Sequence, residues 1–268
     1  MMHLYTPDGR PVYDVPYADK KRANKTRPAT LADARKLGLY PSVTEILGII
    51  DKPGLRAWRD RMVIEAALTQ PADGRPVDDL VPEIRANADE FSRAAMELGT
   101  KYHDAIESLV YYIDGKADAF VPEPDVSLHT MEVFRGWYEA HVTELISAEE
   151  SFAHPLGFAG RLDWFGKLDG NLTVIDWKTQ GTKEGNRFRF YATWAAQLAA
   201  YAYGIGCDLS EVDLVSVVIS TTEPGRIKTK TWDHNAEYFS AFCDAFRLWQ
   251  GPLGKNFNPA ENARKIAA

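Results

Sequence analysis

The chain has 268 residues, of which 45% are hydrophobic and 26% charged, enough apolar sequence for one large domain or for a core with a small lobe. Its formal net charge is -7, so its overall electrostatics repel nucleic acid and any DNA binding has to be local. Two cysteines, Cys207 and Cys243, are too few for a four-thiolate zinc or iron–sulfur site, and we interpret them as reduced thiols.

The beginning of the chain is polar and interrupted by proline. A basic cluster stands out in the first 40 residues, namely Lys20, Lys21, Arg22, Lys25 and Arg27. Such a cluster is suited to contact phosphates, but a solvated arm explains it equally well. The N-terminus lacks the basic-then-apolar order of a signal peptide, and no apolar run approaches the roughly 18 residues that span a bilayer. We therefore expect a cytoplasmic or otherwise intracellular protein without membrane contact.

Helical patterns follow. Ser42 and Glu45 have the S-x-x-E spacing of a capping box, which predicts a helix start. A second helical stretch covers 55–68, and the Pro-, Gly- and Asp-rich segment 70–82 predicts a loop. Together these features predict a helical N-terminal lobe within residues 1–82.

The remaining elements change from helical to mixed. We expect one long helix over 83–113, or two helices broken near Gly99, and a further helix over 128–142. Three strands are then expected, one through Ile146 and Phe152 and the others over 158–168 and 172–178, followed by a helix over 191–203, strands over 212–220 and 226–232, and a closing helix over 236–249. This order predicts a mixed sheet flanked by helices.

A hairpin in this sheet brings two acids together. Asp169-Gly170 is a strong two-residue turn signal, because a type I′ turn needs positive φ at both central positions. If Leu168 pairs with Asn171, counting outward places Asp163 opposite Asp176. Like charges at that spacing are destabilising, and a divalent cation between them is the natural remedy, since Mg²⁺ and Mn²⁺ prefer oxygen ligands.

Two alternatives stay open for this hairpin. A turn centred on Gly170-Asn171 would instead place Asp163 opposite Lys178 and form a plain salt bridge. In both registers Asp163, Asp176 and Lys178 share one face of the sheet. The three residues could also form a surface ion-pair cluster, which the hairpin alone favours as much as a metal site.

Three motifs follow one another here: G-x-x-D from Gly160 to Asp163, I-D-W-K-T from Ile175 to Thr179, and Q-x-x-x-Y from Gln197 to Tyr201. Upstream lies the segment Gly99 to Glu107, which contains His103. In order and spacing the motifs resemble those of PD-(D/E)XK nucleases, in particular the RecB-like branch with its phage and mitochondrial exonucleases. The resemblance implies an α/β restriction-endonuclease-like core over 83–250, after an N-terminal arm and helical lobe over 1–82 and before a tail over 251–268.

The resemblance also implies a site. It assigns His103, Asp163, Asp176 and the backbone carbonyl of Trp177 as ligands of one or two Mg²⁺ or Mn²⁺ ions, and Lys178 as the catalytic lysine beside the two aspartates. An iron–sulfur cluster is not expected, because the cysteines of the members that carry one are missing. Leu162 replaces the proline of the superfamily name, and Asp176 replaces the commoner glutamate.

Further residues are expected around this centre. Gln197 and Tyr201, one helical turn apart, would orient the site or contact the DNA strand. Arg161 could meet a phosphate, with an ion pair to a neighbouring carboxylate as the alternative. Glu107 could hold the imidazole of His103 in one tautomer. Glu149 or Glu150, on the preceding strand, is a candidate to support the metal, and the sequence does not choose between them.

The resemblance implies a DNA-cutting enzyme, expected to be an exonuclease that processes single-stranded or duplex ends in recombination, repair or phage DNA metabolism. A recombination or single-strand-binding protein is an expected partner. The rival interpretations are a structure-specific or restriction-like endonuclease and a DNA-binding module on the same fold that does not cut. In the nuclease mechanism Lys178 stays protonated beside the acids and stabilises developing charge, so we do not expect it to act as a general base.

Overall fold

The computed structural model describes residues 2–19, 24–70 and 74–267. Its centre is a five-stranded sheet in the order β10-β9-β8-β7-β6. The strands are β6 (Val142–His154), β7 (Phe158–Leu168), β8 (Asn171–Gln180), β9 (Asp213–Ser220) and β10 (Ile227–Trp232). β8 and β9 run parallel and the other neighbours antiparallel, so the expected mixed sheet is confirmed.

The β7–β8 turn has the geometry that its sequence predicts. Asp169 and Gly170 have φ values of 50° and 85°, both in the left-handed region that a type I′ turn requires. Leu168 pairs with Asn171, and the ladder continues to the pair of Trp164 and Ile175. The register centred on Asp169-Gly170 is therefore the one that forms, and the alternative centred on Gly170-Asn171 is wrong.

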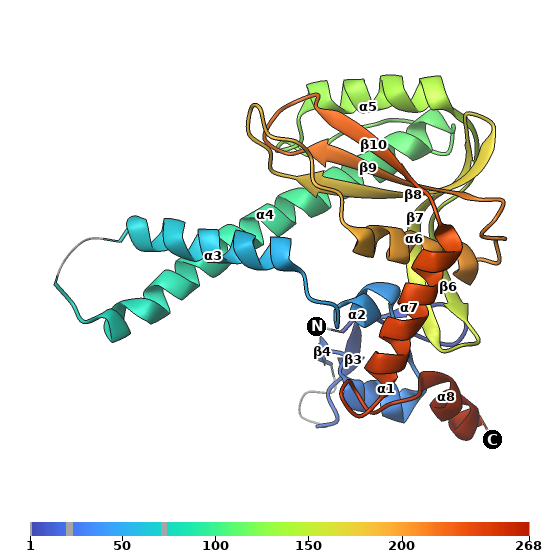
Figure 1. The fold of residues 1–268 in the computed structure, drawn as a ribbon, viewed down its shortest axis with the longest axis horizontal. Helices are drawn as coiled ribbons and strands as arrows, with labels where there is room; N and C mark the ends of the chain where they lie inside the picture. The colour runs from blue at the N-terminus through green and yellow to red at the C-terminus, as the bar shows by residue number, and fades with distance from the viewer. Residues whose placement is uncertain (1, 20–23, 71–73, 268) are drawn as a thin grey trace.

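Helices cover both faces of the sheet (Figure 1). α5 (Leu128–His141) and the second half of α4 (Val77–Ile113) bury one face, on which Phe134, Trp164 and Trp177 are almost fully enclosed. The Trp164 indole N–H donates a 2.9 Å hydrogen bond to the Tyr138 hydroxyl there. On the other face lie α2 (Val43–Leu47), α6 (Ala192–Gly204) and α7 (Asn235–Gln250), which enclose a separate apolar cluster. The domain is thus a helix–sheet–helix sandwich.

The first half of α4 and the helix α3 (Pro53–Leu68) form an arm that projects from this body (Figure 1). α4 is continuous through Gly99, whose Cα lies so near β8 that a Cβ there would sit 3.0 Å from Thr179 Oγ1. α4 also begins at Val77, so the predicted loop over 70–82 extends too far. Asp78 and Asp79 in the first turn favour that helix start, and α4 accepts Pro82 close to its beginning.

The polar start of the chain is more ordered than its sequence predicts. It forms the short strands β1 (Leu4–Tyr5), β2 (Pro11–Val12), β3 (Asp14–Pro16), β4 (Thr26–Pro28) and β5 (Tyr40–Pro41), with α1 (Leu31–Leu37) between the last two. Leu4 and Val15 are buried in the cluster beneath α6 and α7, so this segment belongs to the core. The C-terminal helix α8 (Pro259–Ala267) packs near α1 (Figure 1).

The basic cluster is only partly described. Lys20, Lys21 and Arg22 lie outside the described residues. Arg27 makes a two-pronged ion pair with Asp33, with distances of 2.7 and 2.8 Å, so it fastens β4 to α1. Among the described residues, no helix is both long enough and apolar enough to cross a bilayer.

Candidate active site

The two aspartates of the motifs meet where the β7–β8 ladder ends. The last pair is Trp164 with Ile175, and the next positions in the same register are Asp163 and Asp176. Asp163 Oδ2 accepts a 2.7 Å hydrogen bond from the Trp177 backbone N–H, which ties its side chain to the neighbouring strand. The side chains of Asp163 and Asp176 are only 15% and 2% exposed, so both acids are largely removed from water.

This burial places unfavourable negative charge at one point. Burial first, and the nearby Asp176 second, raise the pKa of Asp163 well above its usual range. A positive charge between the two carboxylates would offset both causes. The acids are therefore arranged at an electrostatic cost that a cation can relieve.

Lys178 supplies one positive charge to this centre. Its Nζ lies 2.5 Å from Asp176 Oδ2 and 5.8 Å from the centre of the Trp194 ring. The lysine side chain is 21% exposed, whereas the aspartate is almost fully buried. Lys178 therefore reaches the acid from the side that faces solvent.

Gln197 and Tyr201 of α6 complete a hydrogen-bonded network below the acid. The Gln197 amide nitrogen lies 2.8 Å from Asp176 Oδ1 and 3.0 Å from the Tyr201 hydroxyl, while its carbonyl oxygen accepts from Lys178 Nζ at 3.4 Å. Both side chains are buried. The ring of Tyr201 lies so close to Gly160 that a Cβ there would meet it at 2.8 Å, which explains the glycine of G-x-x-D.

His103 approaches from α4. Its Nδ1 is 4.0 Å from Asp163 Oδ2, and the ring lies near the Trp177 backbone. Burial, followed by the positive charge of Lys178, lowers the pKa of His103. The imidazole is thus neutral at neutral pH, the form in which a histidine nitrogen binds a metal.

A second charged group flanks the acids. Arg161 Nε lies 2.6 Å from Glu149 Oε2, and its Nη2 lies 3.7 Å from Glu107 Oε1, so Arg161 is paired with two carboxylates. Glu107, expected beside His103, is placed on the Arg161 side of the site. Arg161 thus makes ion pairs in the absence of DNA, and its contact with a phosphate stays a prediction.

Glu149 rather than Glu150 faces this cluster. In the β6–β7 register it stands opposite Asp163, between the pairs of Ala148 with Trp164 and Glu150 with Leu162. Burial raises the pKa of Glu149 to about 7 despite the opposing effect of Arg161. Its left-handed φ of 53° marks an irregular position in the strand. Glu150 is exposed, so the structure separates two residues that the sequence left equivalent.

The donor groups fit a hard divalent cation. Two carboxylates, the Trp177 carbonyl and a neutral imidazole are the oxygen and nitrogen ligands that Mg²⁺ and Mn²⁺ accept. Asp176 Oδ2 is fully buried and accepts no hydrogen bond of normal geometry, although Lys178 lies beside it. Within residues 2–19, 24–70 and 74–267, no three His, Cys, Asp or Glu side chains already form a metal-binding cluster. Water and a phosphate oxygen would therefore have to supply part of the ligand shell.

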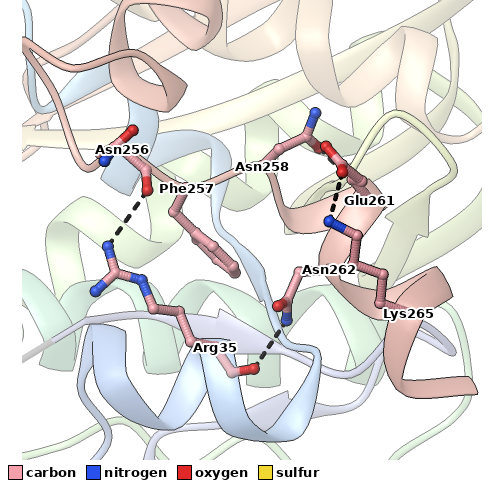
Figure 2. Close-up of a pocket in the computed structure, with 7 residues that line it drawn as sticks. All are labelled: Arg35, Asn256, Phe257, Asn258, Glu261, Asn262 and Lys265. Atoms are coloured by element: carbon pink, nitrogen blue, oxygen red, sulfur yellow. Dashed lines mark hydrogen bonds and ion pairs between the residues drawn. The ribbon is translucent and has the colours of Figure 1, made fainter.

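A hollow of about 230 Å³ lies elsewhere, between α1 and α8 (Figure 2). Its polar side chains are already used within the protein. Arg35 donates to the Lys255 carbonyl at 2.9 Å, Asn262 donates to the Arg35 carbonyl at 2.9 Å, and Lys265 pairs with Glu261 at 2.6 Å. The hydrogen bonds around this hollow attach the C-terminal segment to α1, and none of the motif residues lines it.

The match to a protein family agrees with the geometry. A family model described as the PD-(D/E)XK nuclease superfamily matches residues 74–251, which include every motif residue named above. No curated protein matches the chain. The crystal structure of SSO0001 is similar at 14% identity, with a TM-score of 0.34, and the match covers 74% of this chain and 88% of that one. Because the family model matches about two thirds of its length, the chain belongs to the PD-(D/E)XK nuclease superfamily.

Proposed function

We propose that this protein is a divalent-metal-dependent DNA nuclease that degrades DNA from its ends. The observation that carries the proposal is the convergence of Asp163, Asp176 and Lys178 at the end of the β7–β8 ladder. The preference for ends, and a role in recombination, repair or phage DNA metabolism, rest on the likeness of the motifs to RecB-like exonucleases. The proposed metals are Mg²⁺ and Mn²⁺.

In this proposal the side chains divide the work. Asp163, Asp176, His103 and the Trp177 carbonyl would hold the metal, which supplies an activated water and polarises the phosphate when bound. Lys178, which is paired with Asp176, stabilises the negative charge that develops on the phosphate oxygens. Gln197 fixes Asp176 and Lys178 relative to one another through its two hydrogen bonds.

The test compares end-labelled single-stranded, linear duplex and circular DNA, each with Mg²⁺, Mn²⁺ or EDTA. We expect metal-dependent loss of linear DNA and survival of circles. Cleavage of circles at a similar rate would make the protein an endonuclease. No cleavage of any DNA with either metal, by protein whose fold is intact by circular dichroism, would contradict the nuclease proposal. Asp176→Asn, which keeps the side-chain volume but removes the charge, is the matched control.

A further inference from the structure

The sheet face that carries Asp176 and Lys178 continues to the edge strand β10. Parallel pairing of β8 with β9 and antiparallel pairing of β9 with β10 create two rows across the strands: Asp176, Ser216 and Lys230, then Lys178, Val218 and Lys228. Side chains of one row point to the same face, and two strand spacings amount to about 10 Å. Lys228 and Lys230 therefore lie on the active-site face, a short distance from Lys178.

Aromatic rings fill the interval between these lysines. Lys178 Nζ lies 5.8 Å from the Trp194 ring centre, and the Trp194 and Phe190 rings are 6.2 Å apart. Lys230 Nζ in turn lies 5.8 Å from Phe190 and 3.8 Å from Trp232. Phe190 and Trp194 are only partly buried. Two rings thus connect Lys178 with Lys230, and a third ring, Trp232, lies beside Lys230 on the edge strand.

The loop between β8 and α6 adds further positive charge. Lys183, Arg187 and Arg189 are exposed, as are Lys228 and Lys230. Among the described residues, none of these five side chains is found in an ion pair, whereas Arg161 and Lys178 at the acids are paired. In a chain of net charge -7, such a concentration of unpaired cations is a local exception.

The loop holds a defined position. The Gln180 side chain donates to the Arg189 carbonyl at 2.6 Å and accepts from the Arg189 backbone N–H at 3.1 Å. Arg226 stacks over the Phe188 ring at 4.9 Å and donates to the Asn186 carbonyl, which attaches the loop to the start of β10. The cations are therefore presented by a segment fastened at several points.

A second wall faces the rings. Gly54, in the first turn of α3, lies so close to Tyr191 that a Cβ there would sit 2.8 Å from the tyrosine hydroxyl. The Tyr191 ring centre in turn lies 5.1 Å from that of Trp194. The base of the arm thus packs against the aromatic residues that lie beside Lys178.

We propose that a basic–aromatic path, made of Lys183, Arg187, Arg189, Lys228, Lys230, Phe190 and Trp194, binds a single-stranded segment of the DNA substrate and leads it to Lys178. This inference rests on the proposed function. Single-stranded nucleic acid is recognised by cations that follow the backbone and by rings on which bases stack, and the path offers both side by side. A base-paired stack would leave the rings without a partner, so a single strand fits the path better than a duplex.

The test measures binding separately from cleavage. Fluorescence anisotropy of a labelled oligothymidylate is recorded in EDTA for the intact protein, for Lys228→Ala/Lys230→Ala and for Lys36→Ala/Arg93→Ala. The last variant removes the same charge from exposed positions outside the path. We expect the path variant to bind at least about tenfold more weakly, with a salt slope smaller by roughly 1.4, since each single-strand phosphate contact contributes about 0.7. The control variant should bind like the wild type.

A second variant tests the rings. Phe190→Leu keeps an apolar side chain but removes the stacking surface, and we expect roughly a 5- to 150-fold loss of affinity for oligothymidylate. If both path variants bind as the wild type does, or if a labelled duplex binds more tightly than the single strand, the path is wrong. Failure of the proposed function would look different, because the wild type would then cut no DNA although its binding is normal.

Discussion

Gln197 and Asp176 are joined by a 2.8 Å hydrogen bond that links α6 to the end of β8. The same amide nitrogen also contacts the Tyr201 hydroxyl. The buried Gln197 side chain therefore holds the Asp176 carboxylate from the helix layer that covers this face of the sheet. We therefore propose that Gln197 positions Asp176 and does not itself react.

Gln197→Ala should lower metal affinity and cleavage by about 10- to 100-fold, because it removes the support of a ligand. Tyr201→Phe, which removes only the hydroxyl at the far end of the network, should have a smaller effect. For both variants, calorimetric titration with Mn²⁺ measures the metal affinity and a single-turnover assay measures the rate of cleavage. Equal effects of the two substitutions would mean that Gln197 acts through general packing instead.

Lys178→Ala should reduce cleavage by about 10²–10³ while sparing the fold, because it removes a charge-stabilising donor. Mn²⁺ affinity should stay the same or increase, since Lys178 Nζ competes for Asp176 Oδ2 at 2.5 Å. Asp176→Asn should instead lose metal binding and cleavage together. Weaker Mn²⁺ binding by Lys178→Ala would contradict this division of roles.

Lys178→Arg is the sharper form of the same test. Arginine keeps the charge, but its planar fork does not match the compact contact with Asp176 and Gln197. We expect activity close to that of Lys178→Ala in the same single-turnover assay. Near-native cleavage would show that diffuse positive charge is sufficient at this position.

Glu149→Gln should change stability in a pH-dependent way. The pKa of Glu149 is raised in the folded protein from 4.5 to about 7, so the stability that its protonated form contributes is present below 4.5 and is lost as pH rises through about 7. The variant and the wild type should be equally stable near pH 4.5. Above about pH 7 the variant should be more stable by on the order of 1–3 kcal/mol.

Urea unfolding in EDTA across this pH range measures the difference. Glu150→Gln, at the exposed neighbouring position, is the control and should show no such gain. A stability gain for Glu149→Gln that does not vary with pH would show that the carboxyl group is not the cause.

Tyr138→Phe should destabilise the layer beneath α5. It leaves the buried Trp164 indole N–H without its 2.9 Å acceptor, which costs about 1–3 kcal/mol. Each kcal/mol corresponds to roughly 2–4 °C in a chain of this size. Thermal unfolding measures the Tm of this variant. Tyr203→Phe is the control, because it removes a hydroxyl from a tyrosine that is 36% exposed and so shows the effect of losing a tyrosine hydroxyl as such. Equal Tm values for the two variants would contradict the prediction.

The sheet could be predicted from sequence because its signals are local. β7 has the bounds that alternation predicts, Phe158–Leu168, and Asp169-Gly170 fixes the register with β8. The strands at the start of the chain could not be predicted, since pairings of two or three residues are too short to show a period of two. The helix start at Val77 was missed because its Pro and Asp residues are equally typical of loops.

The candidate site was predictable only in part, because some of its residues lie on one hairpin and others depend on how distant strands pair. Asp163, Asp176 and Lys178 lie on one hairpin, so counting along two strands brings them together. The position of Glu149 depends on a third strand whose register shifts twice before it reaches that residue. Phe190 and Lys230 meet only through the order of strands in the sheet, which no local pattern encodes.

The continuity of α4 has a mechanical consequence. His103 and Val77 belong to the same helix, 103 − 77 = 26 residues apart, which at 1.5 Å per residue is about 39 Å. The outer end of the arm and the imidazole beside Asp163 are thus joined by continuous helix, which passes close to β8 at Gly99 and Thr179. A displacement of the arm that leaves α4 straight would therefore also move the histidine.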